Sequence, residues 1–315
     1  MATTETEPLR TYRGNCHCGA FVYEVELPEI KSVFQCNCSI CHKKGYLWVF
    51  PGEAGDFRVV KGTDDTLTRY SFGPKKLTHK FCPTCATPVM GELPDGPPAQ
   101  QRALNVGARP ASGRGTEMLT RARTGTRNAR RQHLGSGEEA DRFDGTAIGD
   151  KYVPPEYKGA LPEAFEGSKL YTGSCHCGAV SVALTSKPLD ETFDERTIEC
   201  NCSICERNGY YWVYPENSRV VLSGDDANIG RYSFARHMLS KTFCRRCGVC
   251  LTNEYKPLSE EQRAALSAQG RVFDGYAQSH HPVNVRVLQG VDLGGMKPPS
   301  RNDGATNIPP PYVNP

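Results

Sequence analysis

Short stretches in which hydrophobic and polar residues alternate are the main pattern along this chain. The stretches 20–27 and 179–184 partly alternate with a period of two and contain β-branched residues, which is typical of half-buried strands. Short aromatic runs at 47–50 and 211–214 have the length and composition of further strands. This pattern predicts a protein rich in short strands.

Further strand candidates lie next to turn signals, and one segment has the signals of a helix. The runs 57–60 and 219–222 each precede a turn rich in Gly and Asp, and 67–72 and 228–234 follow as the next strand candidates. A helix is predicted at 259–268, where serine offers an N-cap and two glutamates occupy the first turn. We therefore expect a mainly β fold of small antiparallel sheets joined by turns.

Three cysteine motifs occur twice, in the same order. The two sets lie about 160 residues apart, which is too long for a solenoid repeat and indicates a duplicated domain. The matched motifs are G-x-C-H-C-G-A at 14–20 and 173–179, C-N-C-S-I-C at 36–41 and 200–205, and F-C-x-x-C at 81–85 and 243–247.

The duplication predicts where the domains begin and end. We expect a first domain at 10–158 and a second at 165–315, with a proline-containing linker within 152–167. The proline-rich stretches 154–157 and 309–312 are similar, which predicts that both domains close with the same kind of tail.

One stretch of the first domain has no counterpart in the second. The segment 107–140 is rich in Arg and Gly, lacks Lys, and shows no periodicity. We expect a disordered insertion there or an error in the gene model. An Arg-rich nucleic-acid segment is the alternative, but the aromatic residues that would stack on bases are absent.

Charge and cysteine content narrow the class of protein. Lys and Arg total 38 and Asp and Glu 35, so the net charge of +3 argues against a nucleic-acid partner for the chain as a whole. No apolar run is long enough to span a membrane, and the polar N-terminus is unlike a secretory signal. We expect a cytoplasmic protein, with the nucleus as the alternative. Because these compartments keep thiols reduced, the 15 cysteines are expected to bind metal rather than form disulfides.

The cysteines divide into two sets of seven, with Cys250 left over. A structural zinc takes four ligands, whereas a catalytic zinc takes three and keeps one position open. Pairing the two-cysteine motifs gives four ligands per copy and leaves the three-cysteine motif as an open site. Buried thiols without metal and a redox C-x-x-C are the alternatives. The expected four-ligand sets are Cys16, Cys18, Cys82 and Cys85, and Cys175, Cys177, Cys244 and Cys247; the three-ligand sets are Cys36, Cys38 and Cys41, and Cys200, Cys202 and Cys205.

Other polar and aromatic residues near the motifs receive structural interpretations. We expect Trp48 and Trp212 in the core, with pocket walls as the alternative, and Cys250 as a free thiol. For His17 and His176 we expect stacking or a surface position rather than metal ligation. The sequence does not identify a general acid. Surface solvation is expected for four basic residues close to the motifs, namely His42, Lys43, His79 and Lys241.

The combined motifs resemble one family. In both copies their order is similar to that of the glutathione-dependent formaldehyde-activating enzyme and centromere protein V family, and C-N-C-S-I-C is most similar to the centromere protein V branch. The resemblance implies two tandem zinc β-tent domains, a fold similar to that of the small Rab guanine-nucleotide exchange proteins. It also implies up to two zinc ions per domain, one structural on four cysteines and one active on three.

The first copy departs from the family pattern at two places. Ala86 stands where glycine is usual, and the stretch after Asn105 lacks the arginine of Asn284-Val-Arg286. These departures affect the first pocket more than its cysteines, so the second copy is the better candidate for activity.

The resemblance implies a carbon–sulfur lyase-like enzyme that acts on a thiol–aldehyde adduct such as S-hydroxymethylglutathione. The chemistry of the expected ligands agrees with this activity. A zinc on three thiolates activates water poorly but can hold a further thiol as its nucleophilic thiolate. A small-molecule thiol or aldehyde, with glutathione first, is the expected partner. The alternatives are a zinc-stabilised module that binds protein or nucleic acid, and a redox or metal-storage protein.

Overall fold

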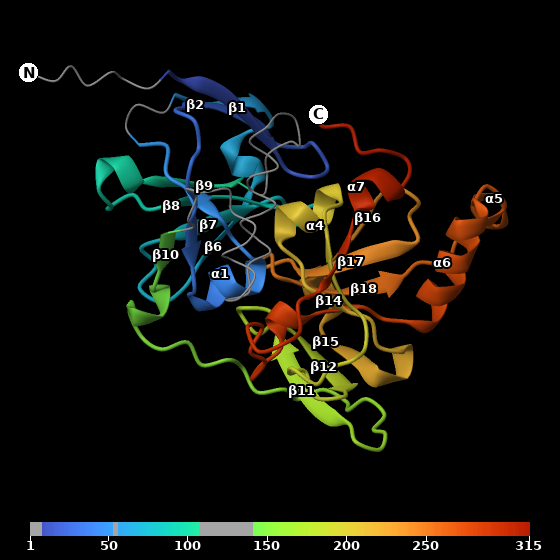
Figure 1. The fold of residues 1–315 in the computed structure, drawn as a ribbon. Helices are drawn as coiled ribbons and strands as arrows, with labels where there is room; N and C mark the ends of the chain where they lie inside the picture. The colour runs from blue at the N-terminus through green and yellow to red at the C-terminus, as the bar shows by residue number, and fades with distance from the viewer. Residues whose placement is uncertain (1–7, 53–55, 107–140) are drawn as a thin grey trace, which may run out of the picture.

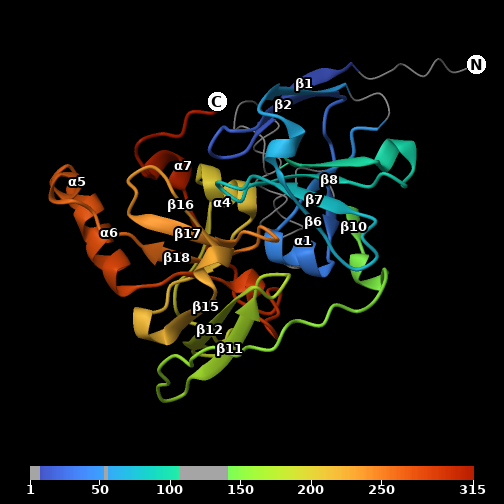
Figure 2. The same cartoon turned by 180° about the vertical axis from the view of Figure 1, so that it is seen from behind.

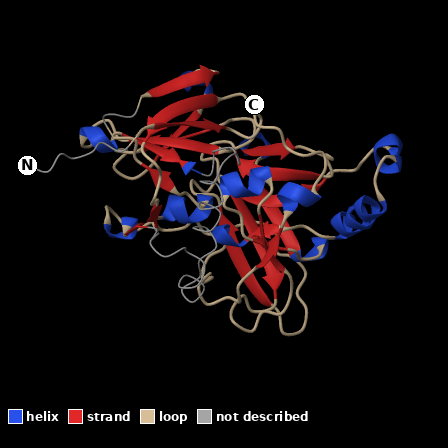
Figure 3. Ribbon diagram, turned by 45° about the horizontal axis from the view of Figure 1, so that its top comes forward, coloured by secondary structure: helices blue, strands red, loops and turns tan. Residues whose placement is uncertain are grey.

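The chain forms two halves of similar, mainly β architecture. The structure is a computed structural model that describes residues 8–52, 56–106 and 141–315, so the predicted insertion at 107–140 lies outside the described residues. Strands make up the body of both halves (Figures 1 and 3), which confirms the mainly β prediction. In the described part of the chain no helix is long and apolar enough to cross a membrane.

The N-terminal half, residues 8–158 as far as they are described, contains a three-stranded and a seven-stranded sheet. The small sheet has the order β1-β2-β5 and the large one β10-β3-β4-β9-β8-β7-β6. The strands are β1 (Arg10–Asn15), β2 (Val22–Leu27), β3 (Phe34–Cys36), β4 (Trp48–Val49), β5 (Phe57–Lys61), β6 (Thr68–Ser71), β7 (Thr78–Phe81), β8 (Pro88–Glu92), β9 (Arg102–Asn105) and β10 (Asp141–Phe143).

The C-terminal half, residues 159–315, repeats this topology strand for strand. Its sheets have the orders β11-β12-β15 and β16-β17-β18-β19-β14-β13-β20. The strands are β11 (Lys169–Ser174), β12 (Val180–Ser186), β13 (Thr197–Cys200), β14 (Trp212–Val213), β15 (Val220–Gly224), β16 (Ile229–Ser233), β17 (Leu239–Cys244), β18 (Cys250–Tyr255), β19 (Val283–Asn284) and β20 (Ser300–Asn302).

Helices are short and few in the described residues. The α-helices are α1 (Ser39–Lys44), α4 (Ser203–Asn208), α5 (Glu260–Ala264), α6 (Ala268–Ser279) and α7 (Gly304–Asn307). The 3-10 turns are η1 (Asp64–Thr66), η2 (Pro98–Gln100), η4 (Gly145–Ala147), η5 (Asn217–Arg219), η6 (Asp226–Asn228) and η7 (Val285–Val287). Both α1 and α4 lie at the junction of the halves, whereas α5 and α6 lie at the outer edge (Figures 1 and 2).

Two details differ from the sequence-based expectations. Each large sheet is antiparallel except for one parallel pair, β3 with β10 and β13 with β20, because the chain returns at its end to the strand that carries the three-cysteine motif. The helix predicted at 259–268 begins with a capping box between Ser259 and Gln262 but ends after Ala264, and a second helix follows.

Hydrophobic core packing continues across the boundary between the two halves. A single buried cluster contains Ile40 and Trp48 of the N-terminal half together with Leu251 and Val285 of the C-terminal half. At the centre of the junction Gly45 and Gly209 come so close that a Cβ on Gly45 would lie 3.0 Å from the Gly209 carbonyl oxygen. The junction is therefore built as tightly as a protein interior.

Candidate metal centres

The two-cysteine motifs of each half come together at one place. Cys16, Cys18, Cys82 and Cys85 form the first four-cysteine cluster, and Cys175, Cys177, Cys244 and Cys247 form the second; within each cluster the sulfur atoms lie within 4.8 Å of one another. Sγ–Sγ distances of 3.5 and 3.6 Å in the first cluster are too long for disulfides. They are close to the separation of about 3.8 Å that follows from zinc–sulfur bonds of about 2.3 Å in a tetrahedron.

Each four-cysteine cluster joins the end of the first strand to the turn that follows β7 or β17. In the second half this turn is closed by Gly248, whose φ of +68° is the left-handed conformation that glycine adopts freely. Ala86 holds the same place in the first half with φ +56°. Its amide donates to the Cys82 carbonyl oxygen at 2.9 Å, so the turn keeps its hydrogen bond despite the strained residue.

The three-cysteine motifs also form compact clusters. Cys36, Cys38 and Cys41 make the first three-cysteine cluster, and Cys200, Cys202 and Cys205 the second, each with its sulfurs within 4.8 Å. In both, a strand supplies the first cysteine, the N-cap position of α1 or α4 the second, and the first helical turn the third. Among the described residues no histidine, cysteine or carboxylate joins these three as a fourth member.

Hydrogen bonds from the surrounding chain favour the thiolate form of the first cysteine. The amide of Cys202 donates to the Cys200 sulfur at 3.3 Å, and the Asn302 side chain does so at 3.4 Å. Hydrogen bonds from the neighbouring cysteines, Cys202 first, lower the pKa of Cys200 to about 2. Cys38 is the main cause of the corresponding shift at Cys36, whose pKa falls to about 3.

The end of each half crosses over its three-cysteine cluster at a glycine. A Cβ on Gly304 would lie 2.5 Å from the Cys200 sulfur and 2.8 Å from the Cys202 Cβ, and Gly145 makes the same approach to Cys36 and Cys38. Only glycine fits this close passage of backbone over sulfur.

Both histidines of the C-H-C motifs are buried and reach into the opposite half. His17 is 3% exposed; its Nε2 hydrogen-bonds with the Ser203 hydroxyl and its Nδ1 with the Tyr232 hydroxyl, both at 2.8 Å. It also stacks on Tyr312 with ring centroids 4.5 Å apart. Burial lowers the pKa of His17 to about 3, so its imidazole is neutral. The predicted stacking is confirmed, whereas a surface position for His17 is wrong.

His176 makes the reciprocal contacts. Its Nε2 hydrogen-bonds with the Ser39 hydroxyl at 2.8 Å and its Nδ1 with the Tyr70 hydroxyl at 2.7 Å. Its ring stacks on Tyr152, again with centroids 4.5 Å apart. Tyr152 is thus the structural equivalent of Tyr312, so the tail similarity expected between 154–157 and 309–312 is in the wrong register.

A cavity of about 450 Å³ lies beside the second three-cysteine cluster. It is lined from both halves, by His17, Cys18 and Gly19 and by Cys202, Ser203, Tyr232, Phe234, Ala235, Gly304, Ala305, Ile308, Pro310, Pro311, Tyr312, Val313 and Pro315. Its polar groups are concentrated at Ser203, Tyr232 and His17, next to the cysteines. This combination of an apolar wall and a few convergent polar groups is typical of small-molecule sites.

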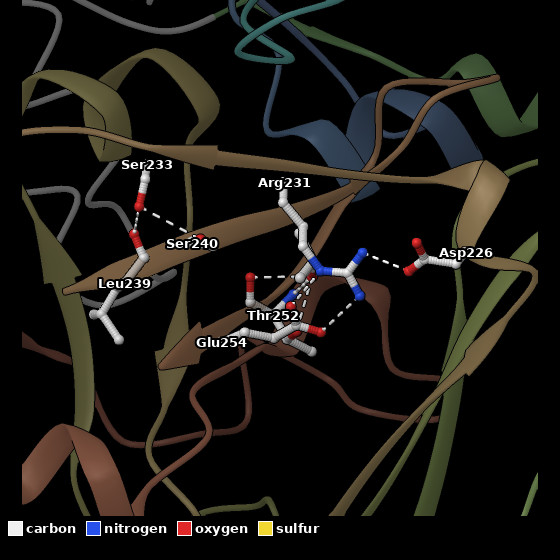
Figure 4. A network of polar contacts seen from close by, with 8 residues as sticks. Asp226, Arg231, Ser233, Leu239, Ser240, Thr252 and Glu254 are labelled. Carbon is white, nitrogen blue, oxygen red and sulfur yellow. Dashed lines mark hydrogen bonds and ion pairs between the residues drawn. The ribbon is translucent and has the colours of Figure 1, made fainter. Parts of the chain in front are cut away.

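Polar contacts fix the strand that carries Tyr232. Its neighbour Arg231 pairs with Asp226 at 2.5 Å and with Glu254 at 2.6 Å (Figure 4). On the other side, the Ser233 hydroxyl donates to the Leu239 carbonyl oxygen at 2.7 Å. These contacts hold β16 in register with β17 and β18, so Tyr232 keeps its place opposite His17.

A second cavity, of about 320 Å³, lies beside the first three-cysteine cluster. Its wall includes Cys36 and Cys41, and its arginines are Arg142 and Arg286. Arg286 belongs to the C-terminal half, and its Nε donates to the Gly209 carbonyl oxygen at 2.7 Å. The arginine of the second copy's motif therefore lines the pocket of the first copy, so the missing arginine is no longer a reason to prefer the second centre.

The basic residues near the motifs are mostly buried, contrary to expectation. Lys43, His79 and Lys241 are 7%, 1% and 8% exposed, whereas His42 is exposed as expected. Lys43 donates to the Ser174 carbonyl oxygen at 3.0 Å, across the junction. Surface solvation is therefore wrong for three of the four.

The remaining buried predictions concern the tryptophans and the unmatched cysteine. Trp48 and Trp212 are buried as predicted, and the Trp48 indole donates to the Cys41 sulfur at 3.4 Å. Burial raises the pKa of the free thiol of Cys250 to about 11.

The residues that sequence reasoning missed are those that act across the junction. The serine of C-N-C-S-I-C occurs in both copies, so the repeat itself carried a signal for Ser39 and Ser203. The pair Tyr-Val at Tyr152 and Tyr312 is also repeated. That these residues contact the opposite copy could not be read from spacing within either one.

Comparison with known proteins places the chain in a family. A crystal structure of a Rhodobacter sphaeroides protein is 24% identical over 39% of this chain and 91% of that one, with a TM-score of 0.28. The profile of the glutathione-dependent formaldehyde-activating enzyme family matches residues 11–112 and 170–285, which is more than half of the chain and includes both copies of the cysteine motifs. The chain therefore belongs to the glutathione-dependent formaldehyde-activating enzyme family, with two tandem copies of its domain.

Proposed function

We propose that this chain is a zinc-dependent carbon–sulfur lyase-like enzyme acting on a thiol–aldehyde adduct such as S-hydroxymethylglutathione. The observation that carries the proposal is the three-cysteine cluster at the wall of a cavity, with no fourth protein ligand among the described residues. Three ligands leave one position for a substrate atom. Family membership supports glutathione and formaldehyde as the chemical class.

The donor sets fit zinc. The four-cysteine clusters would hold structural zinc and the three-cysteine clusters zinc with an open position, because thiolate sulfur is the ligand type that suits this ion. A zinc bound by three thiolates would supply a soft position that holds substrate sulfur as thiolate. In this proposal both halves are zinc β-tent domains, 10–158 and 165–315, similar to the small Rab guanine-nucleotide exchange proteins.

The proposed reaction is the reversible cleavage of the adduct into thiol and aldehyde. The carbon–sulfur bond breaks, sulfur keeps the electron pair and takes up a proton, and the adduct hydroxyl loses its proton as the carbonyl forms. Ser203 and Tyr232 line the cavity next to Cys202 and are fixed by His17. Their hydroxyls are placed to hydrogen-bond the adduct hydroxyl and orient it toward the cysteines.

At the first centre, Arg286 gives the pocket a cation for an anionic thiol. Its side chain lines the cavity that contains Cys36 and Cys41, and among the described residues its terminal nitrogens have no hydrogen bond or ion pair. A guanidinium in this position suits a carboxylate, because its donors match the two oxygens. We propose that it pairs with a carboxylate of glutathione.

The test is the exchange between formaldehyde, glutathione and their adduct, measured by NMR on the full chain with its zinc content confirmed. The native protein should accelerate this exchange, and the double variant Cys38→Ser/Cys202→Ser should lose the acceleration. Cys250→Ala serves as the control, because it removes a buried thiol outside the clusters.

The opposite result would favour a zinc-stabilised binding module. If glutathione at millimolar concentration neither binds nor changes the exchange while zinc is present, the enzyme proposal is wrong. The full chain is required for this test, because the cavity of the second cluster includes His17 of the N-terminal half.

A further inference from the structure

Among the described residues, the hydroxyl of the serine inside each three-cysteine motif has one hydrogen-bond partner, and that partner belongs to the other half. Ser203 is the first residue of α4, directly after Cys202 and two positions before Cys205. Among the described residues its hydroxyl bonds with the His17 imidazole alone, at 2.8 Å. The orientation of a ligand-bearing turn in the C-terminal half is therefore fixed by the N-terminal half.

The histidine is itself held by a four-cysteine cluster. His17 lies between Cys16 and Cys18, and its amide donates to the Thr87 hydroxyl at 3.0 Å. A metal on the four-cysteine cluster would fix both neighbours of this histidine. The hydrogen bond between His17 and Ser203, called the bridge, thus links the first four-cysteine cluster to the second three-cysteine cluster.

The C-terminal tail, residues 309–315, also contacts His17. The Tyr312 hydroxyl donates to the His17 carbonyl oxygen at 2.6 Å while its ring stacks on the imidazole. Asn314 accepts a hydrogen bond from Arg207 of α4 at 2.7 Å. The tail therefore contacts His17 and also the helix that carries Ser203.

The arrangement is reciprocal, which argues against a chance contact. His176 bonds Ser39 at 2.8 Å, and the Tyr152 hydroxyl donates to the His176 carbonyl oxygen at 2.8 Å. The two copies of the repeat thus build the same bridge in opposite directions. The bridges face the three-cysteine clusters, where the position of a ligand-bearing turn affects metal binding.

We propose that each three-cysteine centre is completed by residues of both halves. The histidine of the C-H-C motif in one half is a positioning residue for the serine that lies between the metal ligands of the other half. The inference rests on the metal centres of the proposed function and adds that neither centre is complete within one domain. Outer hydrogen bonds of this kind commonly control metal affinity by about 10- to 100-fold.

The test is zinc retention under a chelator, measured on the full chain in two backgrounds. Cys38→Ser leaves the second three-cysteine centre, and Cys202→Ser leaves the first. In the Cys38→Ser background, His17→Ala should speed the loss of zinc from the second three-cysteine centre by at least about 10-fold. In the same background His176→Ala should change this rate little. With Cys202→Ser the effects should exchange.

Milder variants keep the test decisive if an alanine variant fails to fold. Ser203→Ala should reproduce the effect of His17→Ala, and the double variant should be no worse than either single one, because both remove the same hydrogen bond. His17→Gln, which keeps a polar group near Nε2, should recover part of the retention. The control is His280→Ala, since among the described residues the His280 side chain hydrogen-bonds only to Ser279 and Tyr276 at the end of α6.

Two outcomes would overturn the inference. One is that His17→Ala weakens zinc at the first three-cysteine centre; the other is that it affects both centres equally. If the native chain holds only two zinc ions, the proposed function fails at its metal centres; four ions without the crossed pattern reject this inference alone.

Discussion

At the residue scale, the side chains that surround each centre come from both copies. Arg286 lines the pocket beside Cys36, although the motif that carries it belongs to the C-terminal half. The copy with the broken motif therefore still has an arginine at its own centre. A motif that is intact in sequence identifies a site only after the structure shows which site it enters.

Arg286→Gln tests this assignment. It should raise the KM for glutathione about 10-fold at the first centre, isolated by Cys202→Ser, because the charged partner of the carboxylate is lost. The KM for an uncharged thiol such as 2-mercaptoethanol should change little. Arg271→Gln on α6 is the control, and an equal change with both thiols would contradict the pairing with a carboxylate.

At the scale of elements, the return of the chain to β3 and β13 shapes the three-cysteine centres. The parallel strands β10 and β20 bring Gly145 and Gly304 over the cysteines, where a side chain has no room. The asparagine of β20 also donates to Cys200. The backbone that follows the last strand of each half thus covers the cysteine ligands.

Gly304→Ala should disturb the backbone that covers the second three-cysteine cluster. The new methyl group would lie 2.5 Å from the Cys200 sulfur, so backbone or sulfur must shift and the zinc content should fall from four ions to three. The expected readout is elemental analysis together with thermal unfolding. Gly275→Ala, on α6 with nothing within 4 Å of the new methyl group, should keep all four ions; a full zinc content in Gly304→Ala would refute the steric argument.

Sequence reasoning succeeded for elements whose signal is local and repeated. Strands such as β2 and β12 follow from alternation, and the cysteine groups from the fact that each motif occurs twice. Sequence reasoning failed where the partner lies in the other half. Lys43 and Lys241 are charged residues in short polar stretches, and nothing local shows that the shared core buries them.

At the scale of the whole molecule, duplication has produced a single body with two reciprocal sites. The halves share a core through residues such as Ile40 and Val285, and each tail ends against the opposite half's histidine. Arg13 of β1 donates to the carbonyl oxygen of Pro315, so the C-terminus lies beside the first strand of the N-terminal half (Figure 1). An isolated C-terminal half would lack His17 and a wall of its cavity.

The measurement that tests this account most directly is the zinc content of the full chain, purified without chelator, beside that of Cys38→Ser/Cys202→Ser. One ion for each cysteine cluster gives four in the native chain, and the account predicts two in the variant with its fold retained. Loss of a four-cysteine site, as in Cys244→Ser, should instead unfold the protein, because structural zinc contributes directly to folding. A native chain that holds two ions or none would contradict the open metal centres on which the proposed chemistry depends.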